Sequence, residues 1–254
     1  MTASTENGPI DGLTTTRAAF IEQAQAAGEL YIHQPYELYS EANQRTWQRL
    51  YAHLRPKWEK YANSKFMEGV ENLMLQPDAI PVLSDINRFL SPLSGFKARA
   101  VSGYVPAYMF FDCLRNRSFP TTITIRGGEQ LDYLPEPDIF HDIQGHIPLL
   151  MNKKYADFMW EIGVLGYEIV KNKRNLTPEL VNHNLKRLQN FSWWTYEYGL
   201  LKNSGRTDKF RRVSNDIPYE IYGSGIISSL DETKNIINLW RSCLCEQSRS
   251  RTIF

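Results

Sequence analysis

The stretch Pro135–Leu150 of the sequence, PEPDIFHDIQGHIPLL, holds two of the chain's five histidines, His141 and His146, on either side of a glycine. Proline and acidic residues at its start are typical of a first helical turn, whereas Gly145 followed by Pro148 is typical of a helix end. In an unbroken α-helix, histidines five residues apart point in different directions, because each residue turns the helix by about 100°. A helix that breaks at Gly145 would let His146 swing back toward His141. The pattern therefore predicts a two-histidine metal clamp, and an ordinary helix with one core and one surface histidine is the alternative.

A third ligand candidate follows downstream, in the segment 191–201, FSWWTYEYGLL. On a helix, the nearest neighbours of Glu197 are the apolar residues Trp193, Trp194, Leu200 and Leu201. A lone carboxylate in apolar surroundings is costly unless it is paired, protonated or bound to a cation. Two neutral imidazoles and one carboxylate form the ligand set of non-haem Fe(II) oxygenases, which leaves positions open for O2 and a co-substrate. His141, His146 and Glu197 are therefore the predicted catalytic metal ligands.

Three segments of the chain resemble the pterin-dependent aromatic amino acid hydroxylases, and they occur in the order found in that family. The first is PEPDIFHDIQGHIPLL, the second is WWTYEYGL at 193–200, and the third is YGSGIISS at 222–229. The resemblance extends from Val101 to Ser229 and places the family's iron ligands on the same three residues. It implies a mainly α-helical fold with a few short β-strands, with residues 13–254 as a single catalytic domain. The implied activity is hydroxylation of the ring of a free aromatic amino acid by O2, with Fe(II) and a tetrahydropterin such as tetrahydrobiopterin as cofactors.

The block 101–126, VSGYVPAYMFFDCLRNRSFPTTITIR, resembles the family's pterin-binding loop and the strand that carries its substrate arginine. By this resemblance Phe110 stacks on the pterin ring, and Gly103 and Val105 line the slot around it. Asp142 accepts hydrogen bonds near the pterin, where animal members usually have Glu. For Phe110, plain core packing is the alternative that spacing alone leaves open.

Arg126 is the residue that, by the same resemblance, holds the carboxylate of the amino acid substrate. The chemistry agrees, because a guanidinium presents a bidentate fork to a carboxylate. An exposed arginine at a strand end is the alternative. Further substrate contacts implied by the resemblance are Leu134, Pro137, Trp193, Gly225 and Ser228, the last also as a partner that orients a histidine ligand. Trp193 matches a position where phenylalanine-preferring members carry Trp, which favours L-phenylalanine, with para-hydroxylation to tyrosine as the commoner outcome.

The sequence departs from the family pattern near the substrate. Position 192 is Ser where the family usually places a Tyr close to the metal, and Leu134 replaces a Thr or Gln-like residue. These changes keep open a phenylalanine 3-hydroxylase that makes meta-tyrosine, or a tryptophan hydroxylase. A zinc hydrolase with the same three ligands is a remote alternative, because only Asp142 lies near the histidine pair as a general base.

Composition gives no reason to expect nucleic acid or a membrane as a partner, because the formal net charge is +1. No apolar run approaches the roughly 18–20 residues that span a bilayer, and the N-terminus lacks the form of a secretory signal. The 3 cysteines contain no CxxC pair, which favours reduced thiols in the cytoplasm. The family's regulatory extension and oligomerisation helix are not recognised, so the expected state is a cytoplasmic monomer.

Helical spacing of apolar residues and capping residues predict the remaining elements. Predicted helices cover 14–28, 39–61, 64–75, 84–90 and 154–171, a further one begins at Thr177, and a closing one covers 229–239. An extended run is predicted at 121–126. The polar residues 1–12 are predicted to be disordered.

Overall fold

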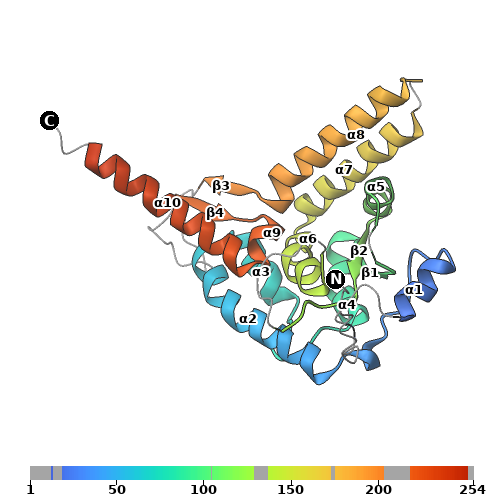
Figure 1. The fold of residues 1–254 in the computed structure, drawn as a ribbon, viewed down its shortest axis with the longest axis horizontal. Coiled ribbons are helices and arrows are strands. Elements are labelled where there is room, and N and C mark those ends of the chain that lie inside the picture. The colour runs from blue at the N-terminus through green and yellow to red at the C-terminus, as the bar shows by residue number, and fades with distance from the viewer. Residues whose placement is uncertain are drawn as a thin grey trace, which may run out of the picture.

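The structure, a computed structural model, describes residues 13, 19–103, 105–128, 137–172, 175–202 and 218–250. Leu134 and the N-terminal residues 1–12 lie outside the described residues. The predicted fold class is confirmed, because the described chain is mainly helical with a few short strands (Figure 1). None of the helices in the described part is long and apolar enough to cross a bilayer.

Ten α-helices are found among the described residues. They are α1 Ala19–Ala26, α2 Glu41–Tyr61, α3 Ser64–Asn72, α4 Leu83–Ser94, α5 Ala107–Arg115, α6 Ile147–Leu150, α7 Lys153–Lys171, α8 Pro178–Ser192, α9 Ser224–Ile227 and α10 Leu230–Ser250. Each predicted helix has a counterpart, although residues 14–18 of the first lie outside the described residues. Helix α3 ends before its predicted end, α4 continues past it, and α10 is longer than expected. The predicted cap of α8 is present, since the Thr177 side chain accepts a hydrogen bond from the backbone N–H of Leu180.

Helix α2 supplies the aromatic part of the core that supports the histidine segment. Its side chains Trp47, Leu50, Leu54 and Trp58 are buried, as their helical spacing predicts. Phe140, the residue before His141, meets the edge of Trp47 at a ring-centroid distance of 5.0 Å and stacks on Trp58 at 6.4 Å. This packing fixes the point at which the histidine segment begins.

Two small sheets are found in the described part of the chain. Strands β1 Lys97–Val101 and β2 Ser118–Thr122 are parallel and are joined through α5. Strands β3 Leu200–Lys202 and β4 Tyr219–Ile221 are antiparallel. The predicted extended run is displaced, because β2 ends at Thr122 and the chain leaves the sheet before it reaches Arg126.

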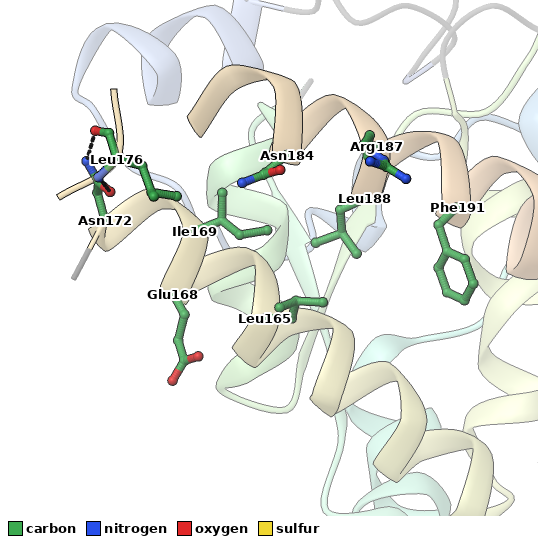
Figure 2. Close-up of a pocket in the computed structure, with 9 residues that line it drawn as sticks. All are labelled: Leu165, Glu168, Ile169, Asn172, Leu176, Asn184, Arg187, Leu188 and Phe191. Atoms are coloured by element: carbon green, nitrogen blue, oxygen red, sulfur yellow. Dashed lines mark hydrogen bonds between the residues drawn. The ribbon is translucent and has the colours of Figure 1, made fainter. Parts of the chain in front are cut away.

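Helices α7 and α8 form a hairpin that projects from the rest of the chain, on the side opposite α10 (Figure 1). A cavity of about 670 Å³ lies along this hairpin, and apolar side chains of the two helices point toward one another there (Figure 2). Its lining residues are Leu165, Glu168, Ile169, Asn172, Leu176, Asn184, Arg187, Leu188 and Phe191. Among these described lining residues there is no histidine or cysteine, so the hairpin cavity is not the predicted metal centre.

Candidate metal centre and substrate site

The histidine segment is a π-helix, His141–His146, that runs directly into α6. The predicted helix break at Gly145 is therefore wrong. A π-helix forms i→i+5 hydrogen bonds, so residues five apart come to lie on the same side without any break. The Nε2 atoms of His141 and His146 are 3.2 Å apart. Pro148 is accommodated in the first turn of α6, where a missing N–H does no harm.

Glu197 also lies in a π-helix, Trp193–Glu197, which continues α8. The predicted apolar surroundings are wrong, because Trp194 is 79% exposed and Trp193 is 47% exposed. Leu200 and its successor are not helical neighbours of Glu197 either, since they belong to β3. The chain turns sharply at Gly199, where a side chain would collide with the ring of Tyr222.

The three predicted ligands nevertheless converge. Glu197 Oε1 lies 3.3 Å from His146 Nε2, and Glu197 Oε2 lies 3.6 Å from His141 Nε2. Two donors at right angles, each about 2.1 Å from one metal ion, would be about 3.0 Å apart. The triangle of donor atoms is therefore close to the size that a single divalent ion requires.

Asp142 is a competing third ligand, because its carboxylate lies within 4.8 Å of donor atoms of both histidines. Glu197 is the better candidate, since its two oxygens lie 3.3 and 3.6 Å from the two Nε2 atoms that face each other. Asp142 is also engaged elsewhere, as its Oδ2 accepts the backbone N–H of Thr122 at 2.7 Å. Burial raises the pKa of Asp142 to about 7, although the Thr122 hydrogen bond acts in the opposite direction.

A chain of hydrogen bonds fixes the tautomer of His141. The Ser228 hydroxyl donates its proton to the carbonyl of Ser224 at 2.8 Å, and a carbonyl can only accept. The Nδ1 of His141, 2.8 Å from the same hydroxyl oxygen, must therefore be the donor in that contact. Its Nε2 consequently carries the lone pair and faces Glu197, as a metal ligand requires.

The charge states of the ligands suit a divalent cation. Burial lowers the pKa of His141 to about 4, although the Glu197 carboxylate acts in the opposite direction. Burial by itself would raise the pKa of Glu197, but His146, His141 and the Ser224 hydroxyl together lower it to about 2. At neutral pH the site thus offers a neutral His141 imidazole and an ionised carboxylate, and such a mixed nitrogen and oxygen set suits Fe(II).

Arg126 is buried, with a side chain only 2% exposed, so the alternative of an exposed strand-end arginine is wrong. Its Nε and Nη2 donate to the two oxygens of Asp138 at 2.7 and 2.8 Å. Its Nη1 donates to the carbonyl of Ser228 at 3.3 Å. Asp138 also accepts the backbone N–H of His141 at 2.9 Å. One buried ion pair therefore ties the predicted substrate arginine to the metal-binding segment.

Phe110, which is expected at the pterin, is linked to His146 through the ring of Phe119. Phe110 is half-buried and meets the edge of Phe119 at 6.0 Å, and the Phe119 ring lies 4.7 Å from the His146 ring. Gly103, with a φ of +115°, and Val105 belong to the loop between β1 and α5. The structure thus brings Phe110 to within two ring contacts of a metal ligand, and it also packs Phe110 against the core.

Trp193 and Gly225, which are expected at the substrate, lie beside Glu197 and Tyr198. Trp193 stacks on Tyr198, with ring centroids 5.6 Å apart. A Cβ added to Gly225 would lie 3.1 Å from the same Tyr198 ring. Pro137 is exposed and directly precedes the Arg126 partner in the chain. Trp193, Tyr198 and Gly225 therefore form one continuous wall next to the carboxylate ligand.

Comparison with known proteins assigns the chain to a protein family. The sequence profile of a family described as "Biopterin-dependent aromatic amino acid hydroxylase" matches residues 15–243. The chain belongs to this family.

Individual members of the hydroxylase family are similar over most of the chain. Phenylalanine-4-hydroxylase of Chromobacterium violaceum is 36% identical over 207 residues, which are 82% of this chain and 62% of that protein. Phenylalanine-4-hydroxylase of Pseudomonas aeruginosa is 36% identical over 203 residues, 80% of this chain and 67% of the relative. A crystal structure of the C. violaceum enzyme with bound iron(III) and 7,8-dihydrobiopterin aligns with a TM-score of 0.69 at 32% identity, covering 83% of this chain and 71% of the other. The chain thus spans about two thirds of the length of these curated hydroxylases.

Two residues of this site were missed at the level of sequence. Asp138 is one of the acidic residues at the start of PEPDIFHDIQGHIPLL, and its position three residues before His141 is the spacing of an N-cap side chain. Ser224 belongs to the segment YGSGIISS, in which only Ser228 is expected to contact a metal ligand, yet the Ser224 hydroxyl donates to Glu197 Oε2 at 2.7 Å. No local pattern reveals that second contact, because it joins residues 27 positions apart.

Ser192, which departs from the hydroxylase pattern, is buried and turned toward its own helix. Its hydroxyl donates to the carbonyl of Leu188 at 3.0 Å. Two phenols stand near Glu197 instead. Burial, with the Glu197 carboxylate as a further cause, raises the pKa of both Tyr155 and Tyr196 well above the usual value. These phenols therefore remain protonated throughout the physiological range.

Proposed function

We propose that this chain hydroxylates the aromatic ring of free L-phenylalanine, using O2, a tetrahydropterin such as tetrahydrobiopterin, and Fe(II). The observation that carries the proposal is the convergence of His141 Nε2, His146 Nε2 and the Glu197 carboxylate within 3.2–3.6 Å of one another. Its support is the family of the chain and its similarity to phenylalanine-4-hydroxylases. Para-hydroxylation to tyrosine is the expected product.

His141, His146 and Glu197 would hold the iron as catalytic ligands. Bound iron and pterin supply the reductive activation of O2, which no amino acid side chain provides. The chain contributes position and the exclusion of water. The Ser228 hydroxyl holds the His141 imidazole in the tautomer that presents Nε2, and the burial of His146 keeps bulk water from that ligand.

Substrate recognition would rest on Arg126. Asp138 accepts hydrogen bonds from its Nε and Nη2 atoms and so fixes the plane of the guanidinium next to the metal-binding segment. A planar guanidinium fixed in this way is pre-organised for the carboxylate of an amino acid. Trp193 and Gly225, joined through Tyr198, would bound the space for the aromatic ring.

Phe110, Gly103, Val105 and Asp142 would form the pterin site. A half-buried Phe110 offers a ring face on which a planar heterocycle stacks. Asp142 contributes a buried carboxyl next to the first histidine. Its raised pKa, near 7, makes it suitable both to accept a hydrogen bond from the pterin and to donate one.

Meta-hydroxylation of phenylalanine is the second candidate function. Ser192 favours it, because the small side chain bonds to Leu188 and leaves out the phenol that the family usually places at this position. A change in the space beside the metal would alter which carbon of the substrate ring faces the metal. A zinc hydrolase is disfavoured, because Asp142, the acid nearest the histidine pair, is held by the backbone of Thr122.

A product assay tests the proposal. The purified protein is incubated with Fe(II), a tetrahydropterin, O2 and, separately, phenylalanine, tyrosine and tryptophan, and products are separated against ortho-, meta- and para-tyrosine standards. Para-tyrosine would support the proposal, and meta-tyrosine would support the second candidate. Hydrolytic activity that requires zinc, with no hydroxylated product, would refute both.

We further propose that residues 13–254 act as one catalytic domain and that the protein is a cytoplasmic monomer without nucleic-acid or membrane partners. Support comes from the net charge of +1 and from the few cysteines without a CxxC pair. Sedimentation of the purified protein at several concentrations tests the monomer, because a mass that rises with concentration would contradict it.

A further inference from the structure

Ser224 stands between the two glycines of the segment YGSGIISS and is fully buried at the start of α9. Its hydroxyl donates to Glu197 Oε2 at 2.7 Å. A hydrogen bond to an ionised carboxylate is shorter and stronger than one between neutral groups. The contact therefore acts on the one charged ligand of the metal site.

The flanking glycines explain why this serine reaches the carboxylate. A Cβ added to Gly223 would lie 2.5 Å from the Glu197 carbonyl oxygen, and one added to Gly225 would lie 3.2 Å from the same atom. Any side chain at Gly223 would thus push α9 away from the glutamate. The pair of glycines lets the backbone of α9 rest directly on Glu197, and only Ser224 carries a side chain there.

The histidine segment also packs against Ser224. A Cβ added to Gly145 would lie 2.8 Å from the Ser224 Cβ, a separation that real side chains do not tolerate. The Ser224 carbonyl accepts the hydroxyl proton of Ser228, whose oxygen in turn accepts the Nδ1–H of His141. The Ser224 hydroxyl thus binds the ligand Glu197, and the Ser224 carbonyl binds Ser228, which in turn binds the ligand His141.

We propose that Ser224 is a positioning residue that fixes the orientation of the Glu197 carboxylate for metal binding, an inference that rests on the proposed metal site. The terminal torsion of a glutamate is broad, so a free carboxylate samples many orientations. The Ser224 hydroxyl binds Oε2 and thereby selects the orientation in which Oε1 faces His146. The site is then organised before the metal arrives.

The first test measures metal affinity directly and needs no turnover. Co(II) is titrated into metal-free protein, and its dissociation constant is compared among the wild type, Ser224→Ala and a matched control, Thr233→Val. Thr233 is buried and its hydroxyl also bonds to α9, at the carbonyl of Ile226, but it touches no metal ligand. We expect Ser224→Ala to bind Co(II) about 10- to 100-fold more weakly, and the control to bind like the wild type.

The second test separates positioning from packing. Unfolding of metal-free wild type, Ser224→Ala, Glu197→Ala and the double variant is followed by urea denaturation. We expect a coupling of about tenfold or more in the unfolding equilibrium constant, because the hydroxyl acts through the carboxylate. A serine that only fills space would give additive effects.

Each result bears on the inference. Equal Co(II) affinities of Ser224→Ala and the wild type would overturn it while the proposed function stands, and so would additivity in the unfolding cycle. A wild type that binds no Co(II) would overturn both. Weaker binding by Ser224→Ala, together with coupling to Glu197, would establish the role.

Discussion

Replacement of Asp138 by Asn is expected to destabilise the protein severely. Asp138 and Arg126 form an ion pair in which the side chains are only 4% and 2% exposed. Asn keeps the shape but removes the charge, so the buried guanidinium loses the carboxylate to which its Nε and Nη2 donate. Breaking a buried pair from one side costs about 3–5 kcal/mol, which is a large part of the total stability of about 5–15 kcal/mol of a typical protein.

The assay is thermal and urea unfolding of the variant beside the wild type. A loss of about 3–5 kcal/mol corresponds to roughly 6–20 °C in the melting temperature of a chain of this size. Asp85→Asn is the matched control, because its ion pair with Arg88 leaves the two side chains 54% and 76% exposed. Exposed pairs contribute about 0–1 kcal/mol, so the control is expected to unfold almost like the wild type.

The pH dependence of the same difference gives a second readout. Burial by itself would raise the pKa of Asp138, but Arg126 outweighs it and holds the pKa below its usual value. A carboxyl with a lowered pKa stabilises the folded state fully above its unfolded pKa of about 3.9, and this contribution is lost as the pH falls through the folded pKa. The wild type and Asp138→Asn are thus expected to converge in stability as the medium is acidified from pH 5. An equal loss in Asp138→Asn and Asp85→Asn, or a difference that does not depend on pH, would refute this account of the pair.

Three further changes have defined outcomes. Ser228→Ala removes the partner of His141 Nδ1, and we expect about 10- to 100-fold weaker Co(II) binding in a titration. Arg126→Lys loses the planar fork, and we expect the KM for phenylalanine to rise by about tenfold or more, with the KM for the pterin unchanged, in steady-state kinetics. Gln144→Met replaces a fully buried carboxamide whose Nε2 and Oε1 have no hydrogen-bond partner among the described residues, and we expect about 1–3 kcal/mol of added stability in urea unfolding.

Unchanged Co(II) affinity in Ser228→Ala would contradict the assigned His141 tautomer. Equal increases in both KM values in Arg126→Lys would place the arginine away from the amino acid and point to a general disturbance of the site. A loss of stability in Gln144→Met would mean that the carboxamide is hydrogen-bonded in solution.

Local sequence patterns predicted the features that neighbouring residues determine, such as the buried face and the start of a helix. The apolar stripe of α2 determines which face is buried, and Thr177 with Pro178 defines the start of α8. The three ligands were predicted because two imidazoles and a carboxylate form a recognisable donor set. By contrast, the pairing of Arg126 with Asp138 and the contact of Ser224 with Glu197 join distant positions, and no periodicity encodes them.

The sequence predicted that the two histidines converge, but it did so through a helix break at Gly145 that the structure does not contain. Apolar spacing does not distinguish a π-helix from an α-helix, because the two differ by one residue per hydrogen-bonded turn. In the structure both ligand-bearing segments, His141–His146 and Trp193–Glu197, are π-helical. Such segments are rare and tend to occur at functional sites.

Because a π-helix is intrinsically less favourable than an α-helix, tertiary contacts are needed to stabilise these two segments. Both segments press on the short helix α9, the first through Gly145 and the second beneath Gly223. Because α9 also provides the Ser224 hydroxyl and leads directly to Ser228, the element that holds the segments in place is the one that orients their side chains. The metal ligands are therefore arranged by the packing of α9, and a change at that contact is expected to reach all three donors together.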